Sequence, residues 1–223
     1  PGKAWRTAIS GATRDANADS LIASCGPTKG LHPDFGTVYA GAPNGLPYVV
    51  VQGRGGEAHV RLDEGRESEP GPNPGHTYGP IEGGTSRGGD RHVLVIDADN
   101  WKDYEMFDAH PVNGGTSWTG GSGAIFDMTA GTTRPAGWTS ADAAGLPILP
   151  GLVRYDEVSG PNEINHAVRF TVRHCNGYVY PASHNAGSAA GALPMGARLR
   201  LKAATDISTF PASVQKIFRA FKK

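Results

Sequence analysis

The 223-residue sequence lacks several features that identify common protein classes at once. It has only two cysteines, it has no apolar run long enough for a membrane span, and its 21 basic residues are balanced by 21 acidic ones. A balanced charge removes the electrostatic reason to expect nucleic acid or an anionic membrane as a partner. We therefore expect neither nucleic acid nor a membrane among its partners, and its oligomeric state stays open.

Local signatures of cofactor sites are also missing. The eight histidines form no H-x-x-x-H pair and the cysteines form no C-x-x-C pair, so nothing local indicates zinc. The glycine-rich stretch 113–124 lacks the Lys-Ser/Thr pair of a phosphate-binding loop. We expect no cofactor and no metal, with one alternative left open. In this alternative, His92, His166 and His184 form a metal site because the fold brings distant strands together.

The two cysteines, Cys25 and Cys175, allow two interpretations. They can be two buried thiols, or one disulfide that joins the N-terminal arm to a late strand. A disulfide would indicate an oxidising compartment. Neither cysteine has the sequence context of a nucleophile, so we expect no catalytic cysteine. Of the two interpretations we expect the disulfide.

Glycine and proline are abundant, with 32 and 17 residues, and they are spread without a period between short apolar runs. This pattern is typical of many turns that join short strands. In 164–172 the side chains of Ile164, Val168 and Phe170 alternate with polar ones, as expected for a strand with one buried face. The strands expected from such runs are 45–53, 57–63, 91–97, 103–109, 122–128, 164–172, 177–182 and 197–203.

Two segments have helical character. Residues 139–148 can form a turn or two that starts at Ser140 and stops at Pro147. Residues 210–223 place apolar side chains at helical spacing and have no C-cap, so the natural chain can continue past 223. The sequence predicts one β-rich domain over 1–223, an antiparallel β-sandwich or jelly-roll-like fold with a short C-terminal helix.

The stretch 81–92 is the first candidate for chemistry. Glu82 and Asp90 flank a loop rich in glycine, which permits close approach of backbone to a ligand, and His92 follows on a strand. Glycoside hydrolysis needs two carboxyl groups, one as acid and one as base or nucleophile. We expect Glu82 and Asp90 to be that pair and His92 to tune them, although a capped strand with surface ion pairs would look the same.

Further candidates come from aromatic and polar residues elsewhere. Aromatic rings on exposed loops can stack on sugars, although a tryptophan in a loop can equally fold back on the core. Asp142 lies in a proline-rich segment that is expected to pack on the core, and it is a further catalytic candidate. The expected substrate-binding residues are Trp118, Trp138, Arg154, Tyr180 and His184.

Five segments together carry a resemblance to a group of secreted bacterial proteins. They are "LHPDFG", "IEGG…GDRHVLVID", "RPAGWTSADAAGLPILPGLVRYDEV", "INHAVRFTV" and "PMGARLRLKA". The resemblance runs from about residue 20 to the end. It implies secretion and chains that extend beyond the position of Lys223, but it implies no activity, so no catalytic residue is carried over.

The sequence thus leads to three functional hypotheses. The first is a secreted carbohydrate-active enzyme, a glycoside hydrolase that acts on a polysaccharide or oligosaccharide with a carboxylate pair. The second is a non-catalytic glycan-binding module that uses the same aromatic residues. The third is an extracellular structural protein, which needs no cleft. Hydrolysis and lyase chemistry are not distinguished by the sequence.

Overall fold

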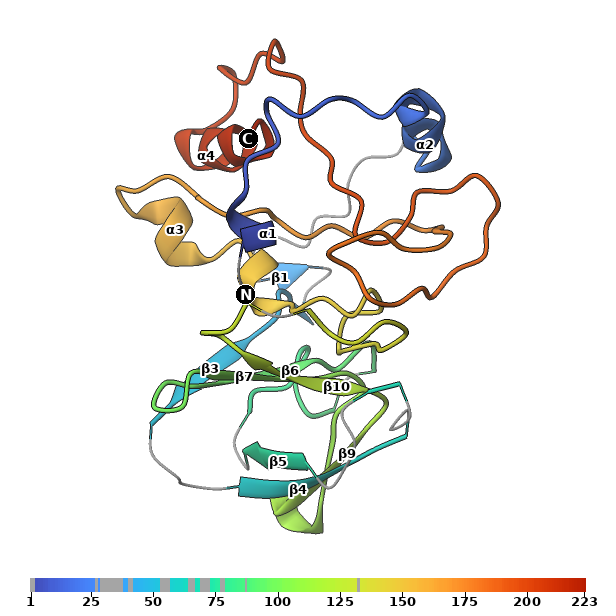
Figure 1. The fold of residues 1–223 in the computed structure, drawn as a ribbon. Coiled ribbons are helices and arrows are strands. Elements are labelled where there is room, and N and C mark those ends of the chain that lie inside the picture. The colour runs from blue at the N-terminus through green and yellow to red at the C-terminus, as the bar shows by residue number, and fades with distance from the viewer. Residues whose placement is uncertain are drawn as a thin grey trace.

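The strands and the irregular segments occupy opposite ends of the molecule in the computed structural model (Figure 1). The strands lie at one end, and most of residues 160–223 lie at the other, together with helix α2 (Ala18–Ser24). The structure describes residues 3–26, 28, 38–39, 42–52, 57–63, 67–68, 73–76, 79–86, 88–131 and 133–223.

The first sheet has the order β10-β7-β6-β3. Its strands are β3 (Tyr48–Val51), β6 (Val93–Asp97), β7 (Lys102–Met106) and β10 (Gly123–Asp127). Strands β6 and β7 form the antiparallel hairpin that the sequence predicts for 91–109. All five residues of β6 are buried, which places this strand at the centre of the protein.

The second sheet has the order β5-β4-β9-β8. Its strands are β4 (Glu57–Leu62), β5 (Asn73–His76), β8 (His110–Val112) and β9 (Ser117–Gly120). A further short pair joins β1 (Val38–Tyr39) to β2 (Ala42–Pro43). The fold is therefore mainly β, as predicted.

The prediction of purely antiparallel sheets is wrong, because both four-stranded sheets are mixed. Strand β3 pairs with β6 in parallel, and β4 pairs with β9 in parallel. The reason is topological. Strand β3 is followed by β4, which lies in the other sheet, so β3 pairs instead with β6 from later in the chain. Strand β4 pairs antiparallel with β5, the next strand, and its other edge takes β9 in parallel. Parallel neighbours of this kind need a crossover connection instead of a hairpin.

One apolar cluster connects the two sheets. Val60 and Trp118 from the second sheet pack with Val93 and Val95 from β6, and Tyr104 is among the partly buried residues around them. Period-two alternation points these side chains to one face of each strand. Burial of this shared face holds the sheets together.

The opposite face of the first sheet is covered by residues 139–152 (Figure 1). Leu94 of β6 packs there against Ala141 and Ile148, and Leu94 and Ile148 are fully buried. The predicted helical turn near 140 is a non-helical turn instead, because Gly145 has a φ of +73° and Pro147 follows two residues later. Helical structure starts only at the 3₁₀ turn η2 (Leu149–Gly151).

The C-terminal helix is confirmed as α4 (Ala212–Phe221), and it contacts α3 (Tyr155–Ser159). The remaining helical elements are α1 (Lys3–Arg6) and the 3₁₀ turn η1 (Asn113–Gly115). Within the described residues no helix combines the length and the apolar character that crossing a bilayer requires.

The strands predicted at 164–172, 177–182 and 197–203 do not form. These segments are irregular. The isolated bridges in this part of the chain join Asn176 to Ser188 and Tyr178 to Met195. Their backbone amides donate to loops instead of to a neighbouring strand; the amide of Ala167, for example, donates to the carbonyl of Trp5. All nine residues of 164–172 line a cavity, so the alternation in their sequence does not separate a buried face from an exposed one.

Candidate functional site

A cavity of about 740 Å³ is lined by the irregular segments 4–9, 139–146, 164–172 and 193–199 together with residues at the end of the first sheet. Its volume lies in the range of about 300–1,000 Å³ that is usual for ligand sites. Polar side chains in its lining that can take part in chemistry include Asp90, His92, Ser122, Asp142, His166, Arg169 and His184. Five of these, Asp90, His92, Asp142, His166 and His184, were singled out from sequence.

The loop 81–92 folds back on itself and brings Glu82 onto His92. Glycines 83 and 84, with φ of +72° and +87°, form the turn. The backbone amide of Glu82 donates to the carbonyl of His92 (2.9 Å), and the amide of His92 donates to Glu82 Oε2 (3.2 Å). Glu82 Oε2 also lies 2.7 Å from His92 Nδ1. The histidine ring is thus oriented by a carboxylate behind it.

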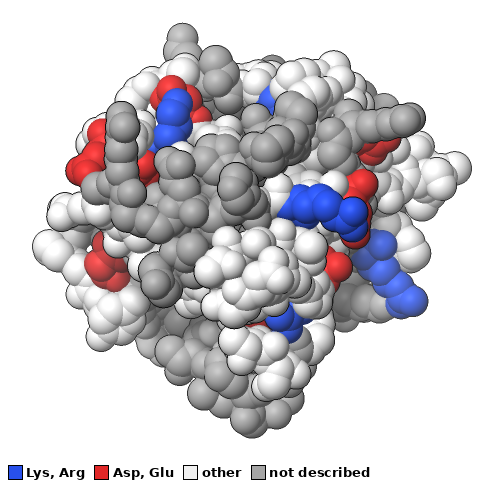
Figure 2. Space-filling model, turned by 90° about the horizontal axis from the view of Figure 1, so that it is seen from below, with Lys and Arg blue, Asp and Glu red and all other residues white. Residues whose placement is uncertain are grey.

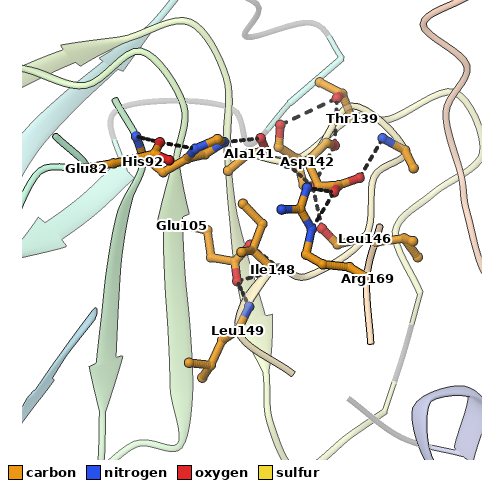
Figure 3. A network of polar contacts seen from close by, with 12 residues as sticks. Glu82, His92, Glu105, Thr139, Ala141, Asp142, Leu146, Ile148, Leu149 and Arg169 are labelled. Atoms are coloured by element: carbon orange, nitrogen blue, oxygen red, sulfur yellow. Dashed lines mark hydrogen bonds and ion pairs between the residues drawn. The ribbon is translucent and has the colours of Figure 1, made fainter. Parts of the chain in front are cut away.

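The charge of Glu82 is favoured by this arrangement. Burial works to raise the pKa of Glu82, but the hydrogen bonds and charge of His92, with a further contribution from Arg169, outweigh burial and lower the pKa. The other ring nitrogen, His92 Nε2, lies 3.2 Å from the carbonyl oxygen of Ala141 (Figure 3). Both ring nitrogens therefore lie within hydrogen-bond distance of an oxygen acceptor.

Asp142 and Arg169 form the second polar group of the cavity (Figure 3). Arg169 Nη2 and Nε donate to Asp142 Oδ2 at 2.6 and 3.2 Å, and the amide of Ala144 donates to Asp142 Oδ1 at 2.9 Å. Three donors fix the carboxylate in one orientation. Arg169 was missed from sequence because it stood among the alternating residues of an expected strand.

The predicted pair of Glu82 and Asp90 is only partly realised. Asp90 is exposed and lines the cavity, whereas Glu82 lies behind His92 and is not part of the lining. Arg91 between them is buried and ties the loop down, with Nε donating to the carbonyl of Ala109 and Nη1 to that of Thr85. The carboxylates that line the cavity are Asp90 and Asp142.

His184 is held at the cavity wall by a backbone contact. Its Nδ1 lies 2.8 Å from the carbonyl oxygen of Ala143, and its Nε2 lies 3.6 Å from a Glu67 carboxylate oxygen. His166 is held in a similar way, with Nε2 2.9 Å from Glu157 Oε1. The alternative of a histidine metal site is not realised: among the described residues, no three His, Cys, Asp or Glu side chains group closely enough to hold a metal ion.

The remaining candidates do not converge on the cavity. Trp118 is only 5% exposed and belongs to the core between the sheets, which is the alternative that the sequence left open. The guanidinium carbon of Arg134 lies over the ring of Trp138, 5.2 Å from the ring centroid. Arg154 pairs with Glu157 (2.6 Å) and supports α3. Tyr180 is 71% exposed.

The prediction of a disulfide is also wrong, because Cys25 and Cys175 are both free thiols. Cys25 Sγ donates to the carbonyl of Leu21 one turn earlier in α2, and Cys175 lines the cavity. Each thiol thus has a separate local environment, and the shared position that a disulfide requires is not formed.

A buried carboxyl pair lies outside the cavity. Asp103 and Glu105 occupy the same face of β7, where residues 139–152 cover the sheet. Glu105 accepts hydrogen bonds from the amides of Ile148 and Leu149, at 2.8 and 2.9 Å (Figure 3). Asp103 is fully buried, and among the described residues neither of its oxygens has a hydrogen-bond partner. Burial raises the pKa of Asp103 to about 7, and burial together with the charge of Asp103 raises that of Glu105 well above its usual value.

Comparison with known proteins adds no relative: no protein-family model, no curated protein and no solved structure matches this chain. The resemblance to secreted bacterial proteins, and the location that it implies, stay predictions.

Proposed function

We propose that this protein is a secreted carbohydrate-active enzyme that hydrolyses a glycosidic bond in the cavity. One observation supports the proposal most strongly. Asp90 and His92, Asp142, and His184 come from three separate parts of the chain, and all four residues line the same cavity of about 740 Å³. A concave site that gathers several acid–base groups is the usual form of an active site.

Hydrolysis would divide the work among these groups. Water adds through its oxygen to the anomeric carbon, the bond from that carbon to the leaving oxygen breaks, and the leaving oxygen gains a proton. His92, oriented by Glu82, is the group proposed to move protons. Asp142, held in one orientation by Arg169 and by the amide of Ala144, presents its carboxylate oxygens to the sugar ring as that ring becomes cationic.

The proposed carboxylate pair is Asp90 and Asp142. Asp142 replaces Glu82 in the pair because it lines the cavity, whereas Glu82 acts as a positioning residue behind His92. The two sheets, packed on a shared core, support a sandwich-like scaffold for this site. The scaffold holds His92 at the end of a buried strand, where an acid–base group keeps its geometry.

The test is a polysaccharide panel assayed for released reducing ends, with Asp90→Asn and His92→Gln beside the wild type. Each substitution should lower turnover by at least about 10²-fold, the usual scale for acid–base groups, while circular dichroism stays unchanged. Ultraviolet absorbance from an unsaturated product would show elimination and would contradict the hydrolytic mechanism. Full activity in both variants would place the chemistry elsewhere.

A non-catalytic glycan-binding module is the second candidate. One observation favours it: three consecutive residues, Tyr178, Val179 and Tyr180, have exposed side chains. Aromatic rings in such positions can stack on sugars. Glycan binding that Tyr180→Ala abolishes, without any release of reducing ends, would support this function over the enzyme.

A further inference from the structure

The charges of this protein are segregated along the chain although they sum to zero. Residues 164–223 contain nine of the 21 basic residues and only one of the 21 acidic ones, Asp206. Residues 1–163 therefore carry the other 12 basic and 20 acidic residues. The C-terminal part has a strong excess of positive charge that the balanced total conceals.

The cavity takes much of its wall from this basic part. Its basic lining residues are Arg6, Arg169, Arg198 and Lys223, and its acidic ones are Asp90 and Asp142. Arg169 and Asp142 neutralise each other through their ion pair. The remaining lining has an excess of positive charge.

Two of these cations are not neutralised within the described part of the chain. Arg198 Nη2 donates to the carbonyl of Thr7, a neutral group, and Arg198 forms no ion pair with any described residue. Arg6 is exposed at the end of α1 and has no acidic partner among the described residues. Both guanidinium groups keep donors for an anion, and arginine binds carboxylates in a two-point fork.

The other end of the molecule differs in this respect. Figure 2 shows the face seen from below, the end at which Figure 1 places β4 and β5, and the described basic and acidic side chains are interspersed there. Arg61 of β4, for example, lies 3.4 Å from Asp63. A negatively charged ligand would therefore be drawn to the cavity rather than to the protein surface in general.

We propose that the cavity binds an acidic polysaccharide whose sugar rings carry carboxylate groups, with Arg6 and Arg198 pairing with those carboxylates. This inference rests on the proposed function and adds the class of its substrate. Each exposed pair contributes up to about 1 kcal/mol, which corresponds to about fivefold in affinity. Two arginines would thus discriminate a charged glycan from its neutral counterpart by about 25-fold.

The experiment measures binding separately from cleavage, by titration calorimetry. The probes are oligogalacturonates, the same oligomers with every carboxylate methyl-esterified, and inorganic polyphosphate. We expect the acidic oligomers to bind at least tenfold more tightly than the esters, and added salt to remove most of that difference. Equal affinity for acid and ester, or equal affinity for polyphosphate, overturns the proposal.

Variants assign the effect to the cavity. Arg6→Ala and Arg198→Ala should each weaken binding of the acidic oligomers about fivefold and leave the esters unaffected. Arg61→Ala, at the far end of the molecule, is the matched control and should change nothing. Because Arg198 also holds the carbonyl of Thr7, Arg6→Ala decides the outcome if Arg198→Ala misfolds. An unchanged affinity in Arg6→Ala contradicts the proposal.

Failure of this inference is distinguishable from failure of the proposed function. Binding of the acidic oligomers without release of reducing ends refutes the enzyme and leaves the ligand class standing. Cleavage of a neutral polysaccharide, with no preference for carboxylates, supports the enzyme and refutes the acidic ligand class.

Discussion

Replacement of Asp103 by asparagine should stabilise the protein at neutral and alkaline pH. Asp103 is fully buried in β7, its oxygens have no hydrogen-bond partner among the described residues, and Glu105 lies on the same strand face. Ionisation therefore places a negative charge in the core, and the interaction with Glu105 offsets only part of the cost of burial. Asparagine has almost the same shape and carries no charge, so it removes the penalty without a change of volume.

The size and sign of this change in stability follow from the pKa of Asp103, which burial raises from 3.8 to about 7. Between these values the unfolded chain has lost the proton while the folded protein keeps it. The contribution of Asp103 to stability is thus full below about pH 4 and is lost as pH rises to about 7. A difference of about three pH units corresponds to at most about 4 kcal/mol, at about 1.4 kcal/mol per unit.

The assay is urea unfolding of wild type and Asp103→Asn at intervals from pH 4 to pH 8. The free energy of unfolding of the variant relative to wild type should be near zero or slightly unfavourable at pH 4. It should then rise steadily and level off above about pH 7. Asp127→Asn in β10 is a matched control with the opposite sign, because a hydrogen bond from Lys102 lowers the pKa of Asp127.

A stability difference that does not change between pH 4 and pH 8 would refute this reasoning. It would mean that Asp103 ionises at its ordinary pKa, through a partner or a water path. Destabilisation by Asp103→Asn that grows with pH would refute it equally, since the carboxylate would then be a favourable group.

Three further predictions concern the core, the loop 81–92 and the cysteines. Leu94→Ala should reduce the free energy of unfolding by about 2–5 kcal/mol in denaturant titrations, because Leu94 is fully buried under residues 139–152; a loss below about 1 kcal/mol would contradict that packing. The pKa of Glu82 is lowered, so its contribution to stability is present above 4.5 and is lost as pH falls through the folded value. Glu82→Gln should therefore weaken the acid dependence of stability, and an unchanged pH profile would argue against the contact with His92. Thiol titration of unfolded, unreduced protein should find two reactive groups, Cys25 and Cys175, and finding none would restore the disulfide.

The strands near the centre of the chain were predictable because their pattern has one physical cause. Val93 to Ile96 is a continuous apolar run followed by a turn and a second strand, and a central strand buried on both faces gives such a run. The C-terminal helix was predictable for the same reason, since its apolar spacing fits a single helix face. Which strands become neighbours was not predictable, because the parallel pairs join residues that are far apart in sequence.

The segment 164–172 shows why alternation can mislead. Period-two alternation predicts a strand with one buried face, but in 164–172 residues from both sides of the pattern line the cavity, and Phe170 is 40% exposed. The partners of the backbone amides, which decide the difference, lie in Trp5 and Gly151 and leave no local signal.

The site was predictable in its residue types and only in part in its geometry. A carboxylate, a glycine loop and a histidine within 81–92 indicated a polar cluster, and Glu82 does contact His92. The role of Asp142 beside Arg169 depends on a contact between positions 27 residues apart, which no local pattern reveals.

The arginines that hold the N-terminal segment have a consequence for the order in which the protein acquires its structure. Arg198 binds the carbonyl of Thr7, and Arg200 binds that of Ile9, across 191 residues of chain in each case. Loops of that length close late and slowly, whereas the β6–β7 hairpin needs only local contacts. The cavity should therefore be completed last during folding and be the first part to open in hydrogen exchange. A ligand that bridges these walls would slow that opening, so protection of residues 4–9 against exchange would report on occupancy of the cavity without any knowledge of the reaction.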